Sequence, residues 1–242
     1  MSAVPDAPPL AALAGDFELL CRLHDRTADA PLLETLRRTP AADWCVLAAE
    51  DPAACTALDA ALAALPAVLD AAALDELAAD YTDLYLNFTR RLAPNESYWR
   101  DEDHLERQAS MFAVRRWYAH YGLAVRDWRQ RADDHLVHEL EFLAALLSSP
   151  GEGALLDAGR FLDRHLLRGS REFLGGVASR ASTDFYAAVA QFTAAYLDTL
   201  RALLVTLTGE ARAAAADSTA AVRASPPPSA PQAYLPGCDP GW

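Results

Sequence analysis

The chain contains no isoleucine and little valine, whereas alanine and leucine are abundant along most of its length. Isoleucine and valine are the residues that suit pleated strands, and alanine and leucine are among the strongest helix formers. The composition therefore predicts an all-α fold. With 242 residues the chain is long enough for one large domain with a substantial core.

Apolar residues recur at the three- and four-residue spacing of a helix face that is turned toward a core. This spacing predicts helices over residues 74–88, 104–121, 136–147 and 184–207. In the second of these, Leu105 and Phe112 are expected on the inner face and Gly122 is expected to end the helix. Weaker patterns predict helices over 44–49, 154–167 and 171–179.

Capping residues predict where further helices begin. Asp16 is expected to cap a helix over 16–26, Pro31 to open a short one, and Asp51 with Pro52 to start another. Residues 90–103 are broken by Pro94 and are predicted to form a loop. Long loops inside compact domains are often functional.

These patterns divide the chain into three predicted parts. Residues 1–15 are expected to be a flexible N-terminus, 16–209 a single multi-helix bundle, and 210–242 a disordered tail rich in alanine and proline. The N-terminus has no charged region followed by a long apolar stretch, so neither an export signal nor a membrane span is predicted. Four scattered cysteines fit a reducing compartment, and we expect a cytoplasmic protein.

The charge balance narrows the kind of partner. Against 21 basic residues stand 34 acidic ones, and the net charge is -13. Such a chain repels nucleic acid phosphates and anionic lipid head groups, and the sequence contains no helix-turn-helix and no evident basic face. We therefore expect no nucleic acid partner and no stable membrane association, and a basic partner is favoured.

Motifs for catalysis are missing from the sequence. It has no GxSxG elbow, no P-loop and no dinucleotide fingerprint, so we expect a protein that is not an enzyme and has no cofactor. One alternative remains open. His135 and His138 lie three residues apart beside several carboxylates, and this spacing also suits a metal-dependent helical-bundle enzyme. Neither HExxH nor a paired Glu-x-x-His is present, and residues 101–104 come nearest to the latter pattern.

Aromatic residues concentrate between Tyr81 and Trp128, close to many carboxylates. Tyrosine rings are apolar and their hydroxyl groups are polar, so this combination favours a groove with an apolar floor and an acidic rim. Such a groove suits an apolar helix that carries arginines.

Three segments resemble a known family. Tyr81-Thr82-Asp83-Leu84-Tyr85, followed by residues 94–99 (PNESYW), is the first; residues 134–143 (DHLVHELEFL) are the second; His165 with residues 185–190 (FYAAVA) is the third. In this order they resemble the TorD/DmsD/NarJ family of redox-enzyme maturation chaperones. The resemblance extends over roughly residues 17–207.

The resemblance implies an all-helical bundle of the TorD-like type that acts as a system-specific chaperone. It would bind the precursor, or the twin-arginine signal peptide, of a molybdenum-cofactor oxidoreductase catalytic subunit and assist cofactor insertion and assembly before export. The state implied is a monomer or homodimer, with no catalytic or metal-binding residues. The positions that match the motifs, and are expected to bind peptide, are Tyr81, Leu84, Tyr85, Pro94, Ser97, Tyr98, Asp134, His135 and Glu139.

One position departs from the family pattern. Many members have proline before the Asp-His pair, whereas this chain has Asp133. Aspartate can cap a helix but does not stiffen the turn as proline does. We therefore expect the local shape of this loop to differ from that of members with proline.

Overall fold

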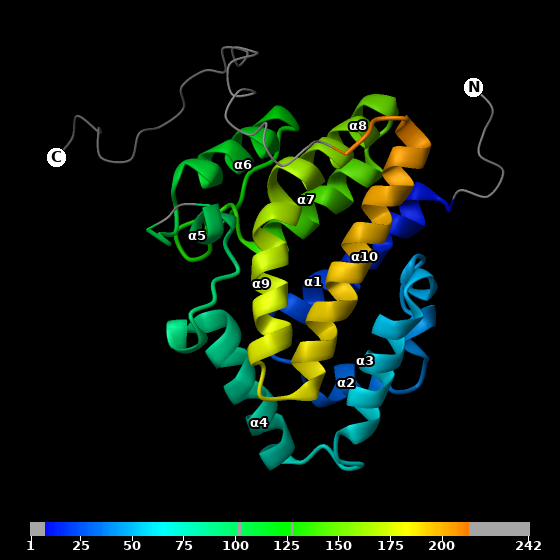
Figure 1. The fold of residues 1–242 in the computed structure, drawn as a ribbon, viewed down its shortest axis with the longest axis vertical. Coiled ribbons are helices and arrows are strands. Elements are labelled where there is room, and N and C mark those ends of the chain that lie inside the picture. Colours follow the sequence, from blue (N-terminus) through cyan, green and yellow to red (C-terminus); the bar gives the residue numbers. More distant parts are fainter. Residues whose placement is uncertain (1–7, 101–102, 127, 213–242) are drawn as a thin grey trace. The chain divides into compact units, whose positions relative to one another are not determined.

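The computed structural model describes residues 8–100, 103–126 and 128–212, except for the side chain of Phe88. Within these residues the structure is built from helices and contains no strand, which confirms the predicted all-α class (Figure 1). No helix in this part is long and apolar enough to cross a membrane. Of the predicted flexible N-terminus (1–15) and the predicted disordered tail (210–242), residues 1–7 and 213–242 lie outside the described residues.

The α-helices follow one another in chain order and are joined by short 3-10 and π segments. They are α1 (Leu10–Asp25), α2 (Ala30–Leu36), α3 (Pro52–Ala64), α4 (Ala71–Tyr81), α5 (Glu96–Arg100), α6 (Ala109–His120), α7 (Leu136–Ser148), α8 (Glu152–Phe161), α9 (Leu167–Arg180) and α10 (Asp184–Thr208). The 3-10 segments are η1 (Ala41–Asp43), η2 (Ala48–Glu50) and η4 (Phe88–Arg90), and the π segments are η3 (Thr82–Leu86) and η5 (Leu162–Leu166).

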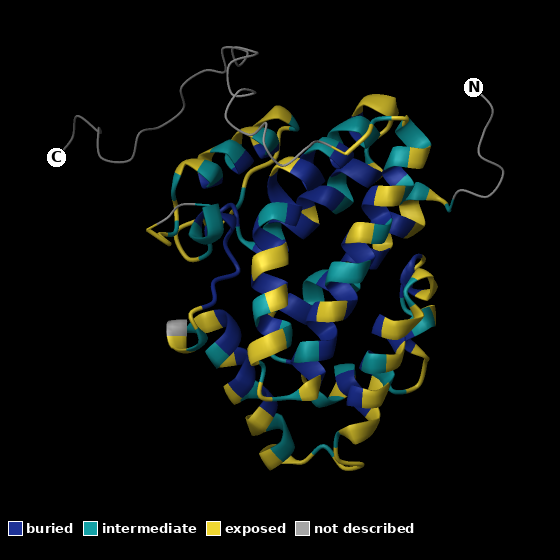
Figure 2. Cartoon of the chain, in the orientation of Figure 1, coloured by how far each residue is buried: buried dark blue, intermediate teal, exposed yellow. Residues whose placement is uncertain are grey.

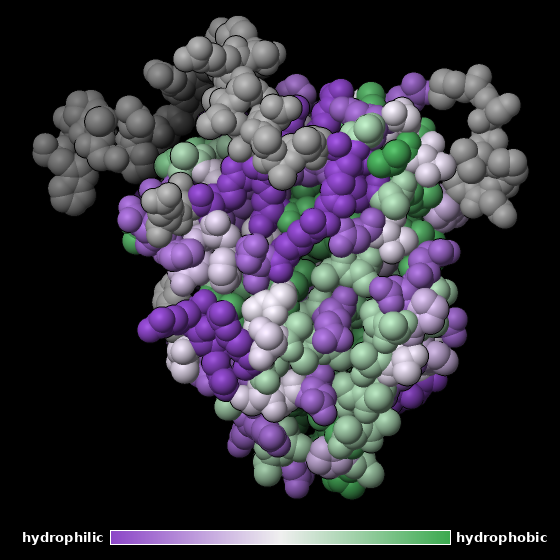
Figure 3. Space-filling view, in the orientation of Figure 1, coloured by the Kyte–Doolittle hydropathy of each residue, from purple (hydrophilic) through white to green (hydrophobic). Residues whose placement is uncertain are grey.

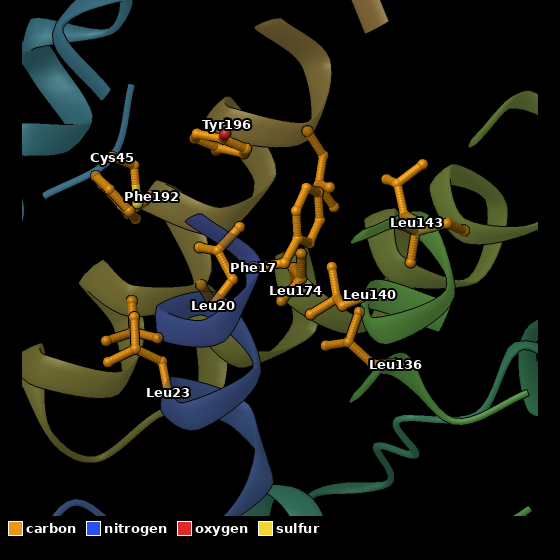
Figure 4. Close-up of a cluster of buried hydrophobic side chains, with 14 of the residues drawn as sticks. Phe17, Leu20, Leu23, Cys45, Leu136, Leu140, Leu143, Leu174, Phe192 and Tyr196 are labelled. Carbon is orange, nitrogen blue, oxygen red and sulfur yellow. The ribbon is translucent and has the colours of Figure 1, made fainter. Parts of the chain in front are cut away.

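The core lies between α1, α7, α9 and α10. Helix α1 packs along α7, and α10 packs along α9 and α3 (Figure 1). Figure 4 shows Phe17 and Leu20 of α1 next to Leu140 of α7 and Phe192 of α10, all of them buried. The predicted helices over 136–147 and 184–207 are confirmed as α7 and α10, and their apolar stripes form this core.

Several predicted helix starts are confirmed by the capping contacts. The Asp51 carboxylate accepts the Ala54 N–H at 3.0 Å at the start of α3, and Pro31 occupies the first turn of α2. Helix α6 ends just before Gly122, whose φ of 69° is the left-handed conformation that favours glycine.

The predicted cap at Asp16 is wrong. Helix α1 begins at Leu10, six residues earlier, and Asp16 is a buried residue within it. Its carboxylate accepts hydrogen bonds from the Val46 N–H at 2.8 Å and from the Tyr196 hydroxyl at 2.5 Å. An aspartate bonded to two distant segments gives the same sequence signal as a capping aspartate. The predicted helix over 44–49 is also wrong, because this stretch contains only bends, a turn and the first two residues of the 3-10 segment η2.

The segment between α4 and α6 differs most from the prediction. Within the predicted loop 90–103, residues Glu96–Arg100 form α5. The predicted helix over 104–121 begins only at Ala109, because His104 and Arg107 have φ angles of 50° and 61° that interrupt a right-handed helix. Leu105 and Phe112 are exposed and do not lie on an inner face.

Burial follows the packing of the helices (Figure 2). The non-helical chain before α5, residues 92–95, is buried like a core element and appears dark blue there. On the face that Figure 3 shows, an apolar area extends over α10 and α3, and hydrophilic side chains predominate in the upper half. The buried connection before α5 leads directly to the motif residues.

Candidate functional site

The two segments with the strongest motifs meet in space. Asn95 and His135 form an isolated antiparallel bridge. The Glu96 N–H donates to the Asp134 carbonyl at 2.9 Å, and the Leu136 N–H donates to the Pro94 carbonyl at 2.8 Å. These reciprocal bonds join the chain entering α5 to the chain entering α7.

Two glycines of α9 make room for this crossing. A Cβ on Gly169 would lie 2.7 Å from the Glu96 Cα, and a Cβ on Gly176 would lie 2.4 Å from the Leu92 Cδ2. The glycines are seven residues apart and so lie on one face of the helix. The segment 92–96 therefore rests directly on the backbone of α9.

Asp134 holds the crossing together from inside. Its fully buried carboxylate accepts the Ser97 N–H at 2.7 Å and lies 3.5 Å from the Asn95 amide nitrogen. The bond to Ser97 caps α5 from a distant part of the chain, which explains a helix that local signals do not predict. The Ser97 hydroxyl in turn accepts the Arg107 N–H at 2.9 Å. Burial raises the pKa of Asp134, and these hydrogen bonds oppose that rise.

A second buried carboxylate lies close by. Glu139 has one oxygen, Oε1, with no hydrogen-bond partner in the described residues. Burial, and then the carboxylates of Glu96 and Asp134, raise the pKa of Glu139 well above its ordinary value. Glu96 contacts His165 at 2.9 Å and Arg100 at 3.2 Å. We call Glu96, Ser97, Asp134, Glu139 and His165 the support layer.

A cavity of about 950 Å³ lies beside the bridge. This volume is at the upper end for ligand pockets. Its lining, here called the cavity wall, comes from Tyr81, residues 85–87, 92–95 and 106–107, Tyr118, residues 123–126 and 130–132, His135 and α7. Four residues predicted to bind peptide lie in the wall: Tyr81, Tyr85, Pro94 and His135. The other five, Leu84, Ser97, Tyr98, Asp134 and Glu139, do not line this cavity.

The tyrosines in the wall are tied to the core. Tyr81 and Tyr85 stack with ring centroids 4.5 Å apart. The Tyr85 hydroxyl lies 2.7 Å from His24 Nδ1, and His24 Nε2 lies 2.8 Å from the Thr193 hydroxyl. The Tyr81 hydroxyl donates to the His24 carbonyl at 3.1 Å. Because both hydroxyl groups are used in the interior, these residues offer the cavity ring carbon, whereas the sequence suggested free polar tips.

The charge of the wall is mixed. Glu106 and Glu141 are its carboxylates, and burial followed by the nearby Asp134 raises the pKa of Glu106. Arg107, Arg126 and Arg131 also line it, so the expectation of an acidic rim is incomplete. The Arg131 guanidinium lies 2.5 Å from Asp25, which neutralises one of the three. The six arginines among residues 107–131 are the sequence feature that could have predicted positive charge in the wall.

The two histidines of α7 have separate structural tasks. The His135 Nδ1 accepts the Val137 N–H at 3.1 Å and thereby caps α7. Burial lowers the pKa of His135 well below its ordinary value, which keeps the ring neutral and able to accept. His138 Nδ1 lies 3.0 Å from Glu141.

This arrangement does not favour the metal-dependent alternative. The ring nitrogen of His135 that points to its own helix is already used as a cap, and His104 lies elsewhere, with Nδ1 2.9 Å from the Tyr98 carbonyl. The described part of the chain contains no group of three or more His, Cys, Asp or Glu side chains placed to hold a metal ion.

Asp133, the departure from the family pattern, stiffens the loop in another way. Its buried carboxylate receives two bonds from the Arg115 guanidinium, at 3.1 Å and 2.7 Å. Its carbonyl accepts the Tyr118 hydroxyl at 2.9 Å. A bidentate pair of this kind fixes geometry well, so the turn is held by side chains of α6 where proline would have held it by covalent structure.

An all-helical domain in which these motif segments pair beside an aromatic cavity agrees with the helical bundle that the motif resemblance implies. The model of the nitrate reductase delta subunit family matches residues 51–176. The match covers more than half of the chain, which therefore belongs to this family of molybdoenzyme maturation chaperones. The comparison with curated proteins found no match. The matched range contains the bridge and the whole cavity wall.

Proposed function

We propose that the cavity binds the N-terminal signal peptide of a molybdenum-cofactor oxidoreductase catalytic subunit. The protein holds this precursor in the cytoplasm and assists cofactor insertion and assembly before export. It does so as a monomer or homodimer, without catalysing a reaction and without nucleic acid or stable membrane contact. Membership of a molybdoenzyme chaperone family supports the kind of partner.

The observation that carries the proposal is the cavity itself. It combines ring and aliphatic carbon from Tyr85, Leu92 and Phe142 with the carboxylates of Glu106 and Glu141. Apolar lining suits the hydrophobic part of a signal peptide, and a partly desolvated carboxylate such as Glu106 pairs strongly with a guanidinium. The twin arginines of the peptide therefore have counterparts at the same opening.

The test uses a fluorescently labelled signal peptide from a molybdoenzyme catalytic subunit of the same genome. Binding to the full chain is measured by anisotropy. We expect the double variant Glu106→Gln/Glu141→Gln to weaken binding about tenfold, because two charge-assisted contacts are lost. Replacing both peptide arginines by glutamine should weaken binding similarly and should remove most of the difference between the two proteins.

Glu152→Gln is the matched control, since Glu152 is exposed at the start of α8 and outside the cavity wall. It should bind like the unmodified chain. Equal affinity of the unmodified chain for the arginine and glutamine peptides would contradict the proposal.

A further inference from the structure

Positive charge is concentrated in one short stretch of this acidic protein. Residues 107–131 contain six arginines and a single aspartate, whereas the whole chain has a net charge of -13. These arginines are Arg107, Arg115, Arg116, Arg126, Arg129 and Arg131. Arg107, Arg126 and Arg131 line the cavity, whereas Arg115, Arg116 and Arg129 lie outside its lining. The net charge of the whole chain conceals this local excess of positive charge.

Within the described part of the chain, most of these arginines have no acidic partner. Arg115 pairs with Asp133 and Arg131 pairs with Asp25. The other four form no ion pair with any described residue. Elsewhere many arginines are paired, such as Arg201 with Asp163 at 2.8 Å. Guanidinium groups without an acidic partner attract carboxylates electrostatically.

Exposed aromatic rings lie among these arginines. Phe112 is 48% exposed and Trp128 is 41% exposed. The Arg115 guanidinium carbon lies 5.4 Å from the centroid of the Phe112 ring and 5.3 Å from that of Trp128, and the Arg129 carbon lies 5.5 Å from the Trp128 ring. Phe112, Arg115, Trp128 and Arg129 thus form a continuous stack, which we call the aromatic–arginine stack.

A contact within the protein, between Arg115 and Asp133, holds the aromatic–arginine stack in place. The Asp133 carboxylate holds Arg115 with two bonds and is itself buried. Arg115 contacts both aromatic rings, so the bidentate pair also fixes their positions. Tryptophan, phenylalanine and arginine are the residues enriched at protein interfaces, and a fixed side chain loses little entropy on binding. Exposed rings held in this way are a feature of an interaction surface.

We infer that Arg116 and the aromatic–arginine stack (Phe112, Arg115, Trp128 and Arg129) form a second docking surface, outside the cavity, for a polypeptide segment that combines carboxylates with apolar side chains. Carboxylates pair with the forks of Arg116 and Arg129, and apolar side chains cover Phe112 and Trp128. The net charge of the chain opposes phosphate polymers and anionic membranes, which present repeated charge over long distances. A short acidic segment needs only this local surface.

The test uses a labelled 16-residue peptide of glutamate and leucine, and the same peptide with glutamine at each glutamate. Binding is measured by anisotropy at about 50 mM and about 200 mM salt, since screening weakens such contacts. We expect Arg116→Glu/Arg129→Glu to weaken binding of the glutamate peptide at least about tenfold. Arg38→Glu/Arg164→Glu, which changes the net charge equally at exposed sites elsewhere, should weaken it less than about threefold.

Three outcomes would overturn the inference. These are equal weakening by both double variants, equal binding of the glutamate and glutamine peptides, or binding of phosphatidylserine vesicles or duplex DNA in preference to the peptide. Arg116 and Arg129 do not line the cavity. Signal-peptide binding should therefore persist in Arg116→Glu/Arg129→Glu, and its failure in the unmodified chain would count against the proposed function alone. Circular dichroism checks that both variants fold.

Discussion

The support layer and the cavity wall are adjacent, yet their polar groups are bonded very differently. In the support layer Asp134, Ser97 and Glu96 bond to other parts of the protein, and one Glu139 oxygen is the exception. In the wall, Arg126 has no ion-pair partner among the described residues and Glu141 has a largely exposed side chain. Five of the nine residues predicted to bind peptide thus lie outside the cavity wall, whereas Arg126 and Glu141, which were not predicted, line it together with the other four.

This contrast predicts that the largest loss of stability comes from Asp134→Ala. The substitution leaves the buried Ser97 N–H without its acceptor and removes the cap of α5, which costs about 2 to 3 kcal/mol of unfolding free energy. Urea denaturation measures the change. Asp75→Ala, at an exposed position of α4, should change stability by less than about 0.5 kcal/mol. If Asp134→Ala instead unfolded at the same urea concentration as the unmodified chain but bound the signal peptide more weakly, Asp134 would have a role in peptide binding and none in stability.

A second prediction concerns the crossing of residues 92–96 over α9. Gly169→Ala places a methyl group against the Glu96 backbone, where only 2.7 Å is available, and should destabilise the fold by about 1 to 2 kcal/mol. Gly175→Ala is a close control on the same helix, because nothing lies within 4 Å of its added Cβ. It should be neutral or stabilising by up to about 1 kcal/mol. Thermal or urea unfolding of the pair distinguishes close packing from helix propensity.

The last prediction tests whether Glu139 keeps a proton in the folded protein. Its pKa is raised in the folded protein, so the folded state keeps a proton that the unfolded chain releases above about pH 4.3. Stability therefore falls as the pH rises from there toward the folded pKa. Glu139→Gln cannot ionise and should escape this loss, so it should unfold at higher urea than the unmodified chain at pH 7 and lose that advantage near pH 4.5. If the difference in urea midpoint between Glu139→Gln and the unmodified chain were the same at pH 4.5 and pH 7, the folded protein would not keep the proton on Glu139.

Sequence patterns located most of the helices because helix formation depends on local spacing. The stripe from Leu136 to Leu147 is buried as α7, and Asp51 caps α3. The failures share a cause. Asp16 carries the signal of a cap but is bonded to Val46 and Tyr196, and α5 forms because Asp134 caps it from a distance. Neither bond has a signature within ten residues of chain.

The sequence by itself determined the helical class, the order of the strong helices and the family. Composition and the order of motifs can be read directly from the chain, without knowing which residues are in tertiary contact. Only the tertiary structure decided that the Pro94–Ser97 and Asp134–Leu136 segments pair, that Tyr85 turns its hydroxyl toward His24, and that the arginines of 107–131 reach the cavity and the neighbouring surface. The physical reason is that side-chain exposure and partnership depend on which helices pack together. That packing is set by the whole core, and a local pattern does not contain it.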